Sequence, residues 1–441
     1  MKILILTASQ PLKIAGIVAY DLYIGLKRSG SEVKILTKAW DKYLDKNIVP
    51  IDSTLTEYKH RFWNLLRRII IKLLKVFLGF KVKEEPKVKT DPNFAVQGED
   101  QTVTIYKTKK ILRRAGFVPD AIIVLFMPHF LSFRNLHELN QVTKAPIYLY
   151  LMDMASMTGG CHYAWDCKGY EKKCGNCPAF YSINEQDSSR TNWEFKKKYI
   201  DKTEITAIAG TEWQYQQLKK SSLFSERPMR KILLSIDNEV FKPGDKNQAR
   251  AYFKLPVDKK IIFFGAVYFD RNRNKGFREL IIALNYLKNT LFDASTVHIA
   301  IAGHASKSLE ESLSFDYTYL GYLNIEKLAL AFQAADVFVS PSIEDSGPMM
   351  INQSIMSGTP VVSFEMGAAL DLVINGQTGY RVRLLDSEAL ANGIRTILEL
   401  DEASTIRISN NCRELGLQLC HSRKQIEKML EIINPDLTIN I

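Results

Sequence analysis

Between residues 337 and 380, a carboxylate, a glycine turn and the start of a helix follow one apolar run. Residues 337–340 predict a buried strand, and Glu344 follows in the loop at its carboxyl end. A helix is expected to begin just after Gly347, because the next residue is a proline, which the first helical turn tolerates. The unpaired backbone N–H groups of Met349 and Met350, aided by the helix dipole, would then bind phosphate. Glu344 beside them can accept hydrogen bonds from sugar hydroxyls.

A second pair with chemical potential, Lys275-Gly276, follows the apolar run 261–265. Taken alone, Lys275 could be an exposed lysine in the turn that starts a helix, and Glu344 could be a solvated loop carboxylate. Both follow strands of one predicted parallel sheet, and ligands of such sheets bind at the carboxyl ends of the strands. A shared ligand is therefore the favoured interpretation.

Short apolar runs alternate with helical patterns along the whole chain, which predicts parallel sheets covered on both faces. The first series of strands is expected at 3–6, 33–36, 121–126, 146–151, 207–209 and 232–234. The second series is expected at 261–265, 298–303, 319–321, 337–340 and 360–364. Helices are expected at 16–29, 325–334 and 388–399, among others. The predicted fold is α/β, with two doubly wound, Rossmann-like domains facing each other across a cleft.

The chain has 441 residues, of which 46% are hydrophobic and 24% charged. This length predicts two large domains or three small ones, and the composition excludes a disordered or fibrous protein. The net charge of +11 suggests a polyanionic partner: nucleotide phosphate, anionic lipid or nucleic acid. The apolar residues 3–6 are too few for a signal peptide, and no uncharged apolar run reaches about 18 residues. A cytoplasmic protein without a membrane-spanning helix is expected.

Several motifs, in order and at matching separations, resemble family 4 of the retaining glycosyltransferases, which have the GT-B fold. They are the glycine loop and helix around Gly16, the stretch 211–243, Gly265 followed by Lys275-Gly276, the run 334–342, and Gly358-Thr359-Pro360. The resemblance covers nearly the whole chain. It implies that Glu344 contacts hydroxyls of a donor sugar and that Lys275 neutralises the leaving diphosphate.

The resemblance also supplies further site residues. Together with the phosphate-binding amides, it gives a predicted donor-binding set of Gly16, Gly265, Arg271, Arg273, Gly276, Gly321, Tyr322, Ser346, Gly347, Met349, Met350 and Asn352. Two of these positions mark departures from the family. Asn352 stands where the family has a second glutamate for the ribose, and Ala266 stands where an arginine is common. Arg271 or Arg273 could supply the missing cation.

A third departure lies before the sequence Thr-Gly-Gly-Cys-His-Tyr at 158–163. The resembling subgroup commonly has a His-Asp pair there, whereas this chain has Met152 and Asp153. Asp153 is therefore kept as a catalytic candidate beside Glu344 and Lys275. His129 and His162 are candidates on the acceptor side, although a hydrogen-bonded loop histidine is the simpler interpretation of His129.

Four cysteines, Cys161, Cys167, Cys174 and Cys177, fall within an insert at 158–178. Four thiolates so close together fit a tetrahedral structural zinc site, in which His162 could replace one cysteine. Two disulfides are the alternative, which a reducing cytoplasm disfavours. Four thiolate ligands leave no open position, so no catalytic metal is expected, and catalysis requires no cofactor. Cys412 and Cys420 are expected to be buried small residues.

Residues 58–83 alternate basic and large apolar side chains without a single acidic residue. This pattern is typical of a basic amphipathic helix that lies on an anionic membrane surface. The alternative is an amphipathic helix packed on its own domain. The first interpretation predicts a peripheral protein on the inner face of the cell membrane.

Together these features predict a retaining hexosyltransferase that uses a nucleotide-diphosphate sugar. Its acceptor would be a saccharide or a lipid-linked saccharide, in the synthesis of a surface polysaccharide. We expect an acceptor domain at 1–236, a donor domain at 237–420 and a helix at 421–441 that crosses back to the first domain. The alternative is a catalytically degenerate nucleotide-binding or scaffold protein, suggested by Met152, Asn352 and Ala266. A nucleic-acid binder is disfavoured, because the basic segment lacks an interleaved aromatic platform.

Overall fold

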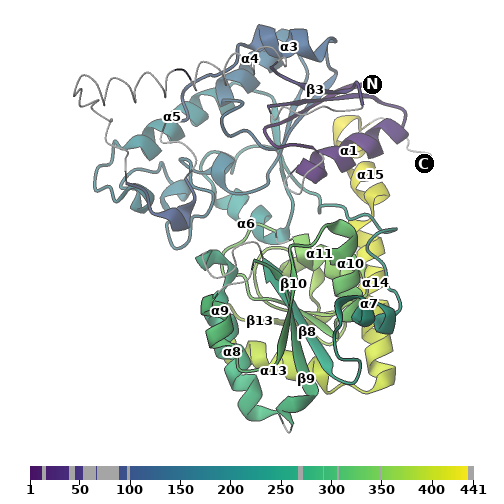
Figure 1. The fold of residues 1–441 in the computed structure, drawn as a ribbon. Helices are drawn as coiled ribbons and strands as arrows, with labels where there is room; N and C mark the ends of the chain where they lie inside the picture. The colour runs from purple at the N-terminus through teal and green to yellow at the C-terminus, as the bar shows by residue number, and fades with distance from the viewer. Residues whose placement is uncertain are drawn as a thin grey trace. The chain divides into compact units, whose positions relative to one another are not determined.

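The computed structural model describes residues 1–11, 16–38, 45–52, 66, 89–96, 100–266, 272–291, 293–304, 307–347 and 349–435 (Figure 1). The chain divides into two compact units. The first comprises Met1–Leu151, Ala155–Ala207 and Ser221–Pro228, and the second comprises Met152–Met154, Ile208–Lys220 and Met229–Ile441. The domain boundaries that we expect at 236/237 and 420/421 concern function and stay predictions.

In the described residues the first sheet has seven strands in the order β3-β2-β1-β4-β5-β6-β7. These strands are β1 (Lys2–Thr7), β2 (Glu32–Thr37), β3 (Ile48–Pro50), β4 (Ala121–Val124), β5 (Ile147–Tyr150), β6 (Ile205–Ala209) and β7 (Met229–Lys231). β1 pairs in parallel with both β2 and β4, and its residues 3–6 are fully buried. Burial on both faces explains why this strand is continuously apolar instead of alternating.

The helices of this part of the chain are α1 (Ile17–Arg28), α3 (Thr108–Ala115), α4 (Phe133–Thr143), α5 (Ser188–Ile200) and α6 (Glu212–Lys220). α1 packs on β1 and β2, whereas α3 packs on β2 and α4. Figure 1 shows α1 on one side of the sheet and α3 and α4 on the other. The segment between β5 and α5 holds only short 3-10 turns, among them Gly169–Glu171 and Pro178–Phe180.

The second sheet has six described strands in the order β10-β9-β8-β11-β12-β13, and its recorded pairings are all parallel. They are β8 (Lys260–Ala266), β9 (Val297–Gly303), β10 (Tyr317–Gly321), β11 (Val337–Ser340), β12 (Val361–Phe364) and β13 (Gly379–Val382). The strand order reverses between β8 and β11, because the chain first builds outward through β9 and β10. The loops after β8 and β11 therefore open at the same point of the sheet.

Helices cover both faces of the second sheet (Figure 1). They are α7 (Lys246–Phe253), α8 (Phe277–Thr290), α9 (Lys307–Ser312), α10 (Ile325–Ala334), α11 (Met349–Met356), α12 (Ala369–Leu372), α13 (Ser387–Leu398), α14 (Glu402–Cys420) and α15 (Ser422–Ile433). α13 packs on α8, and α10 packs on α7. Phe263, Phe332 and Phe338 meet edge to face or tilted, with ring centroids 5.3 to 5.7 Å apart, in the core beneath α10.

The predicted fold class, two doubly wound parallel sheets with helices, is confirmed. Most predicted strands and helices form within a few residues of their expected bounds. The strand expected at 232–234 is wrong: the ladder residues are Met229–Lys231, and Ile232 and Leu233 instead enter the core. An apolar run indicates burial, and burial does not require a place in a sheet. The short strands β3 and β13 were not expected.

The predicted basic segment 58–83 lies outside the described residues, apart from Leu66. In the part of the chain that is described, no helix is both long and apolar enough to cross a membrane.

Candidate functional site

The loops after β8 and β11 carry Lys275 and Glu344, which the sequence predicted to share a ligand. The carbonyl oxygen of Asn274 joins these two loops. It accepts hydrogen bonds from the backbone N–H groups of Ile343 at 2.9 Å and Glu344 at 3.3 Å. Residues 70 positions apart in sequence are thereby fixed beside each other at the point where the strand order reverses.

Gly276 allows this close approach of the two loops. Its φ of +68° lies in the left-handed region, which side-chain-bearing residues rarely adopt. A Cβ at this position would also lie 1.8 Å from the carbonyl oxygen of Pro341. Both constraints require glycine, so the predicted Lys-Gly turn has a structural reason as well as a chemical one.

An ion pair holds the Lys275 side chain. Lys275 Nζ lies 2.6 Å from Asp345 Oδ2, and the side chains of the pair are 27% and 11% exposed. The other oxygen of the carboxylate, Oδ1, accepts the backbone N–H of Gly347 at 3.1 Å. Asp345 thus links the predicted phosphate-binding cation to the turn before α11. Sequence reasoning missed Asp345; its position next to Glu344 was the available signal.

The turn before α11 is buried and carries a hydroxyl that lacks a partner. Glu344 and Ser346 are 7% and 6% exposed. Ser346 Oγ finds no hydrogen-bond partner in the described residues. The Ser346 carbonyl, by contrast, accepts from Thr211 Oγ1 at 2.6 Å, which fixes the backbone of the turn. A buried hydroxyl next to the first amides of a helix is suited to bind an anion.

Met349 and Met350 form the start of α11, as predicted. Gly347 precedes them, and a Cβ on this glycine would lie 3.0 Å from Thr211 Cγ2. Lys275, Gly276, Ser346, Gly347 and the start of α11 therefore belong to one corner of the second unit. This corner combines a cation, helix amides and a hydroxyl, which together can hold a diphosphate.

The predicted residue Gly321 ends β10, and Tyr322 follows it and is 55% exposed. Its ring stacks on His304, which follows β9, with centroids 6.3 Å apart and planes 28° from parallel. Sequence reasoning missed His304, although this residue directly follows the predicted strand 298–303. The pair forms an aromatic surface at the carboxyl edge of the sheet, and such surfaces can stack on a nucleobase.

Asn352 is 4% exposed and points into the fold. Its Nδ2 donates to the Leu234 carbonyl at 3.2 Å and to Cys420 Sγ at 3.6 Å. The amide hydrogens are thus used within the protein, and a role of Asn352 in donor binding stays a prediction. Both buried thiols outside the cysteine insert, Cys412 and Cys420, lie on α14 as expected.

The remaining residues of the predicted donor loop are only partly placed. Arg271 lies outside the described residues, whereas Arg273 is exposed in a 3-10 turn, Arg273–Lys275. Gly265 lies in β8 opposite Ala302 of β9, where a Cβ would meet the Ala302 carbonyl oxygen at 2.6 Å. The close approach of β9 explains why this position is glycine.

In the first unit, Gly16 and His129 follow β1 and β4, the strands between which the order of that sheet reverses. A Cβ on Gly16 would lie 2.0 Å from the Gln10 carbonyl oxygen, so α1 can begin there only with glycine. His129 is exposed, with a φ of +54°. Both residues occupy the positions at which this fold class binds ligands.

Asp153 and His162 each form a hydrogen bond through the backbone. The Asp153 carbonyl accepts from Gln214 Nε2 at 3.3 Å, within the second unit. His162 is buried, and its backbone N–H donates to the Phe94 carbonyl at 3.0 Å. Their predicted catalytic and acceptor-side roles stay predictions.

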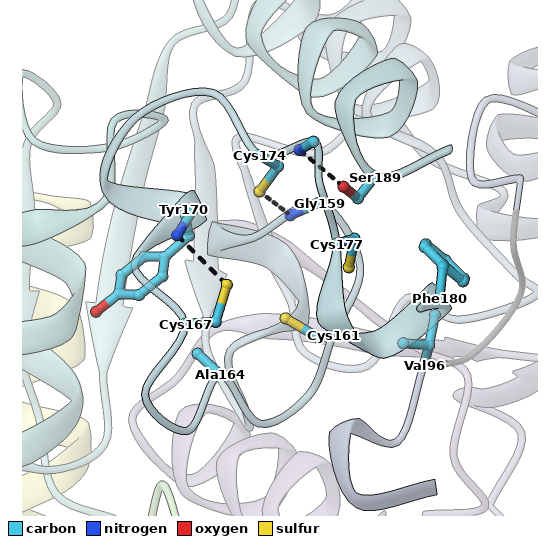
Figure 2. Close-up of a pocket in the computed structure, with 12 residues that line it drawn as sticks. Val96, Gly159, Cys161, Ala164, Cys167, Tyr170, Cys174, Cys177, Phe180 and Ser189 are labelled. Carbon is cyan, nitrogen blue, oxygen red and sulfur yellow. Dashed lines mark hydrogen bonds between the residues drawn. The ribbon is translucent and has the colours of Figure 1, made fainter. Parts of the chain in front are cut away.

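The four cysteines of the insert line one pocket of about 20 Å³ (Figure 2). None of them forms a disulfide. Burial raises the pKa of Cys161 and of Cys174 to about 12, and it also raises the pKa of Cys177. As the side chains stand, no group of three or more His, Cys, Asp or Glu residues in the described chain is placed to hold a metal.

The second sheet and its loops are the part of the chain that matches a known family of proteins. Residues 258–400, which include Lys275 and Glu344, match the family model described as "Glycosyl transferases group 1". The chain is 28% identical over 214 residues to the D-inositol 3-phosphate glycosyltransferase of Mycolicibacterium smegmatis, covering 46% of this chain and 47% of that protein. The chain thus spans less than half the length of this relative.

Solved structures match over nearly the full length. Sucrose-phosphate synthase from Thermosynechococcus elongatus superposes with a TM-score of 0.66 at 17% identity, covering 98% of both chains. Anabaena Alr3699/HepE in complex with UDP and glucose superposes with a TM-score of 0.60 at 16% identity, covering 99% of this chain and 100% of that one. These likenesses confirm the GT-B fold.

Proposed function

We propose that this protein transfers a hexosyl unit from a nucleotide-diphosphate sugar to a saccharide or lipid-linked saccharide, with retention at the anomeric carbon. The observation that carries the proposal is that the Asn274 carbonyl accepts hydrogen bonds from the backbone of Ile343 and Glu344, which holds the Lys275 and Glu344 loops together and supports a shared ligand. A phosphate site and a carboxylate at the reversal point of the strand order suit a donor that contains both diphosphate and sugar.

The comparisons support the donor class. The family match covers the loops of Lys275 and Glu344, and one structure of the same fold contains UDP and glucose. The relative from Mycolicibacterium smegmatis is named as a glycosyltransferase. We therefore assign the diphosphate to Lys275 and the start of α11, the sugar hydroxyls to Glu344, and the base to the stacked pair His304–Tyr322.

In the proposed reaction, the bond between the anomeric carbon and the phosphate oxygen breaks while a bond to the acceptor oxygen forms on the same face. The acceptor hydroxyl gives its proton to the departing phosphate, so no protein base is needed in place of Met152. Lys275, the Ser346 hydroxyl and the helix amides stabilise the negative charge that develops on the diphosphate. Glu344 holds the sugar in a reactive orientation, which contributes through positioning.

A saccharide acceptor carried on a polyprenyl lipid, in surface polysaccharide synthesis at the inner face of the cell membrane, follows from the basic segment 58–83. Eight lysines and arginines in that segment, without an acidic residue, would attract anionic lipid headgroups. Reversing the charges of residues 61–75 should release the protein from vesicles that contain anionic lipid. Unchanged co-sedimentation with these vesicles would refute the membrane contact.

The second candidate function is that of a degenerate nucleotide-binding or scaffold protein. The side-chain amide of Asn352 favours this function, because it already donates hydrogen bonds to the Leu234 carbonyl and to Cys420 Sγ within the protein. Such a protein would bind nucleotide at Lys275 without transferring sugar.

A thermal-shift panel with UDP, GDP, ADP and their sugar conjugates would identify the donor, because a ligand that binds only the folded state raises the Tm. Transfer of radiolabel from that donor to a lipid extract then tests for catalysis. Glu344→Gln should abolish transfer, whereas Glu402→Gln, an exposed glutamate at the start of α14, should not. Binding without transfer would favour the scaffold function, and NMR of the product would show whether the configuration is retained.

A further inference from the structure

The four cysteines between β5 and α5 have no place in the proposed donor site, yet they lie together. Figure 2 shows the sulfurs of Cys161, Cys167, Cys174 and Cys177 directed into one pocket from different sides. The pocket has a volume of about 20 Å³. One water molecule needs roughly 10–15 Å³ by this measure, so there is room for a single atom-sized occupant.

Backbone amides point at the sulfurs of this pocket. The N–H of Gly159 donates to Cys174 Sγ at 3.2 Å, and the N–H of Gly169 donates to Cys167 Sγ at 3.4 Å. Amide donors stabilise the negative charge of a thiolate far more than a neutral thiol, and the donors around metal-bound sulfur do the same.

The backbone is shaped to bring the last two cysteines to the same point. Cys174, Gly175 and Asn176 all have φ in the left-handed region, at +52°, +92° and +48°. Two of these three residues are not glycine, so the turn is strained. A Cβ on Gly169 would lie 3.4 Å from Cys167 Sγ and 4.0 Å from Cys174 Sγ, in ordinary van der Waals contact, so the backbone at Gly169 lies next to both sulfurs.

The segment that contains the cysteines has little else to stabilise it. Residues 151–187 contain only short 3-10 turns in place of longer helices or strands. Connections of this length without regular structure are uncommon in compact domains. A cross-link among four points of the segment would offset the chain entropy that its ordering costs.

The lining of the pocket is uncharged. No acidic side chain lines the pocket among the described residues. Charges of both signs lie outside the lining: Lys168, Lys172 and Asp166 are exposed, and Asp187 Oδ2 accepts the backbone N–H of Cys177 at 2.8 Å. The proposal therefore depends on the sulfurs and the backbone around them.

We propose that Cys161, Cys167, Cys174 and Cys177 bind one structural zinc ion that fixes the segment between β5 and α5. Four sulfur ligands in tetrahedral arrangement select zinc or iron, and a closed site of this kind serves stability. Because no three of these side chains are placed to hold a metal as they stand, ion binding must draw the sulfurs inward. The proposal is independent of the donor chemistry, so the two can fail separately.

The test is the metal content of the full chain, purified under reducing conditions without chelator from cells supplied with zinc. We expect about one zinc per chain. Cys167→Ser and Cys177→Ser should each reduce the zinc to a trace. Cys412→Ser removes a buried thiol of the second unit and should leave the zinc unchanged.

A second measurement covers the case in which the variants do not fold. Titration of wild-type protein with a mercurial should release zinc in step with the modification of the four thiols. Replacement by Co²⁺ should give the absorption of a tetrahedral thiolate complex. Zinc-free wild-type protein that gives no such Co²⁺ spectrum would overturn the proposal. So would an intact mass lower by four hydrogens than that of the reduced chain, which indicates two disulfides.

Discussion

Lys275→Ala is the sharpest test of the donor site, because the structure gives this lysine a local partner and the proposed function gives it a ligand. Its ion pair with Asp345 is 2.6 Å long, and the lysine side chain is 27% exposed. A partly exposed pair contributes about 0.2–1 kcal/mol to stability, so the Tm should fall by no more than about 3 °C. A hydrogen bond to a charged group contributes about 1.5–3 kcal/mol, so UDP should bind roughly 10- to 100-fold more weakly.

Calorimetry of UDP binding, with thermal denaturation of the same samples, measures both quantities. Lys259→Ala is the matched control. Lys259 directly precedes β8 and forms an ion pair of 3.0 Å with Asp316, so its replacement also removes an ion pair of the second unit. Its Tm should fall by a similar amount while UDP affinity stays unchanged.

Asp345→Asn completes the experiment. This change removes the carboxylate that competes with diphosphate for Lys275, so UDP affinity should be kept or rise. The loss caused by Lys275→Ala should persist in the Asp345→Asn background. A Lys275→Ala variant with wild-type UDP affinity would refute the assignment of the diphosphate to this lysine. It would leave the ion pair as a purely structural contact.

Three further predictions concern the frame around the site. Gly276→Ala should lower the unfolding free energy by about 3 kcal/mol, because the new Cβ would meet the Pro341 carbonyl and the residue would have a positive φ. The denaturant midpoint should fall accordingly, and an unchanged midpoint would show that the two loops separate without penalty. Lys231→Met should lower the unfolding free energy by about 1–3 kcal/mol, because Asp371, whose side chain is 4% exposed, loses its cation; a stabilised variant would contradict this. The hydrogen bond from Lys231, with a smaller effect of Gln216, lowers the pKa of Glu212 from its ordinary value of 4.5. The ionised carboxylate therefore contributes stability at pH values above 4.5, and this contribution is lost as the pH falls through the lowered pKa. The Tm of the wild type should therefore fall more steeply in acid than that of Glu212→Gln, and parallel curves would refute the assignment.

The repeating pattern of the fold was readable in the sequence because it depends on contiguous residues. The run 3–6 is apolar at every position and the run 337–340 at its first three, and both form strands buried on both faces. β13 was not predicted, because Gly379–Val382 is short and mostly half-exposed. Its position in the sheet depends on pairing with β12. Its Gly379 lies so close to Val361 that a Cβ would meet the carbonyl at 1.8 Å, a constraint that only the assembled sheet reveals.

The candidate site divides in the same way. Residue types and local turns in the sequence predicted Lys275, Gly276, Glu344 and the start of α11. They did not predict that Asp345 binds Lys275, that the Asn274 carbonyl joins the two loops, or that Asn352 turns toward Leu234.

Sequence by itself therefore determined which residues could do chemistry and which segments form strands and helices. Tertiary structure decided which of those residues meet. The physical reason is that helix and strand formation depend on neighbours a few positions away. The contact between Lys275 and Asp345 spans 70 positions and exists only because β8 and β11 lie side by side in the sheet. The four cysteine sulfurs likewise reach one pocket through a strained turn whose shape the spacing alone does not specify.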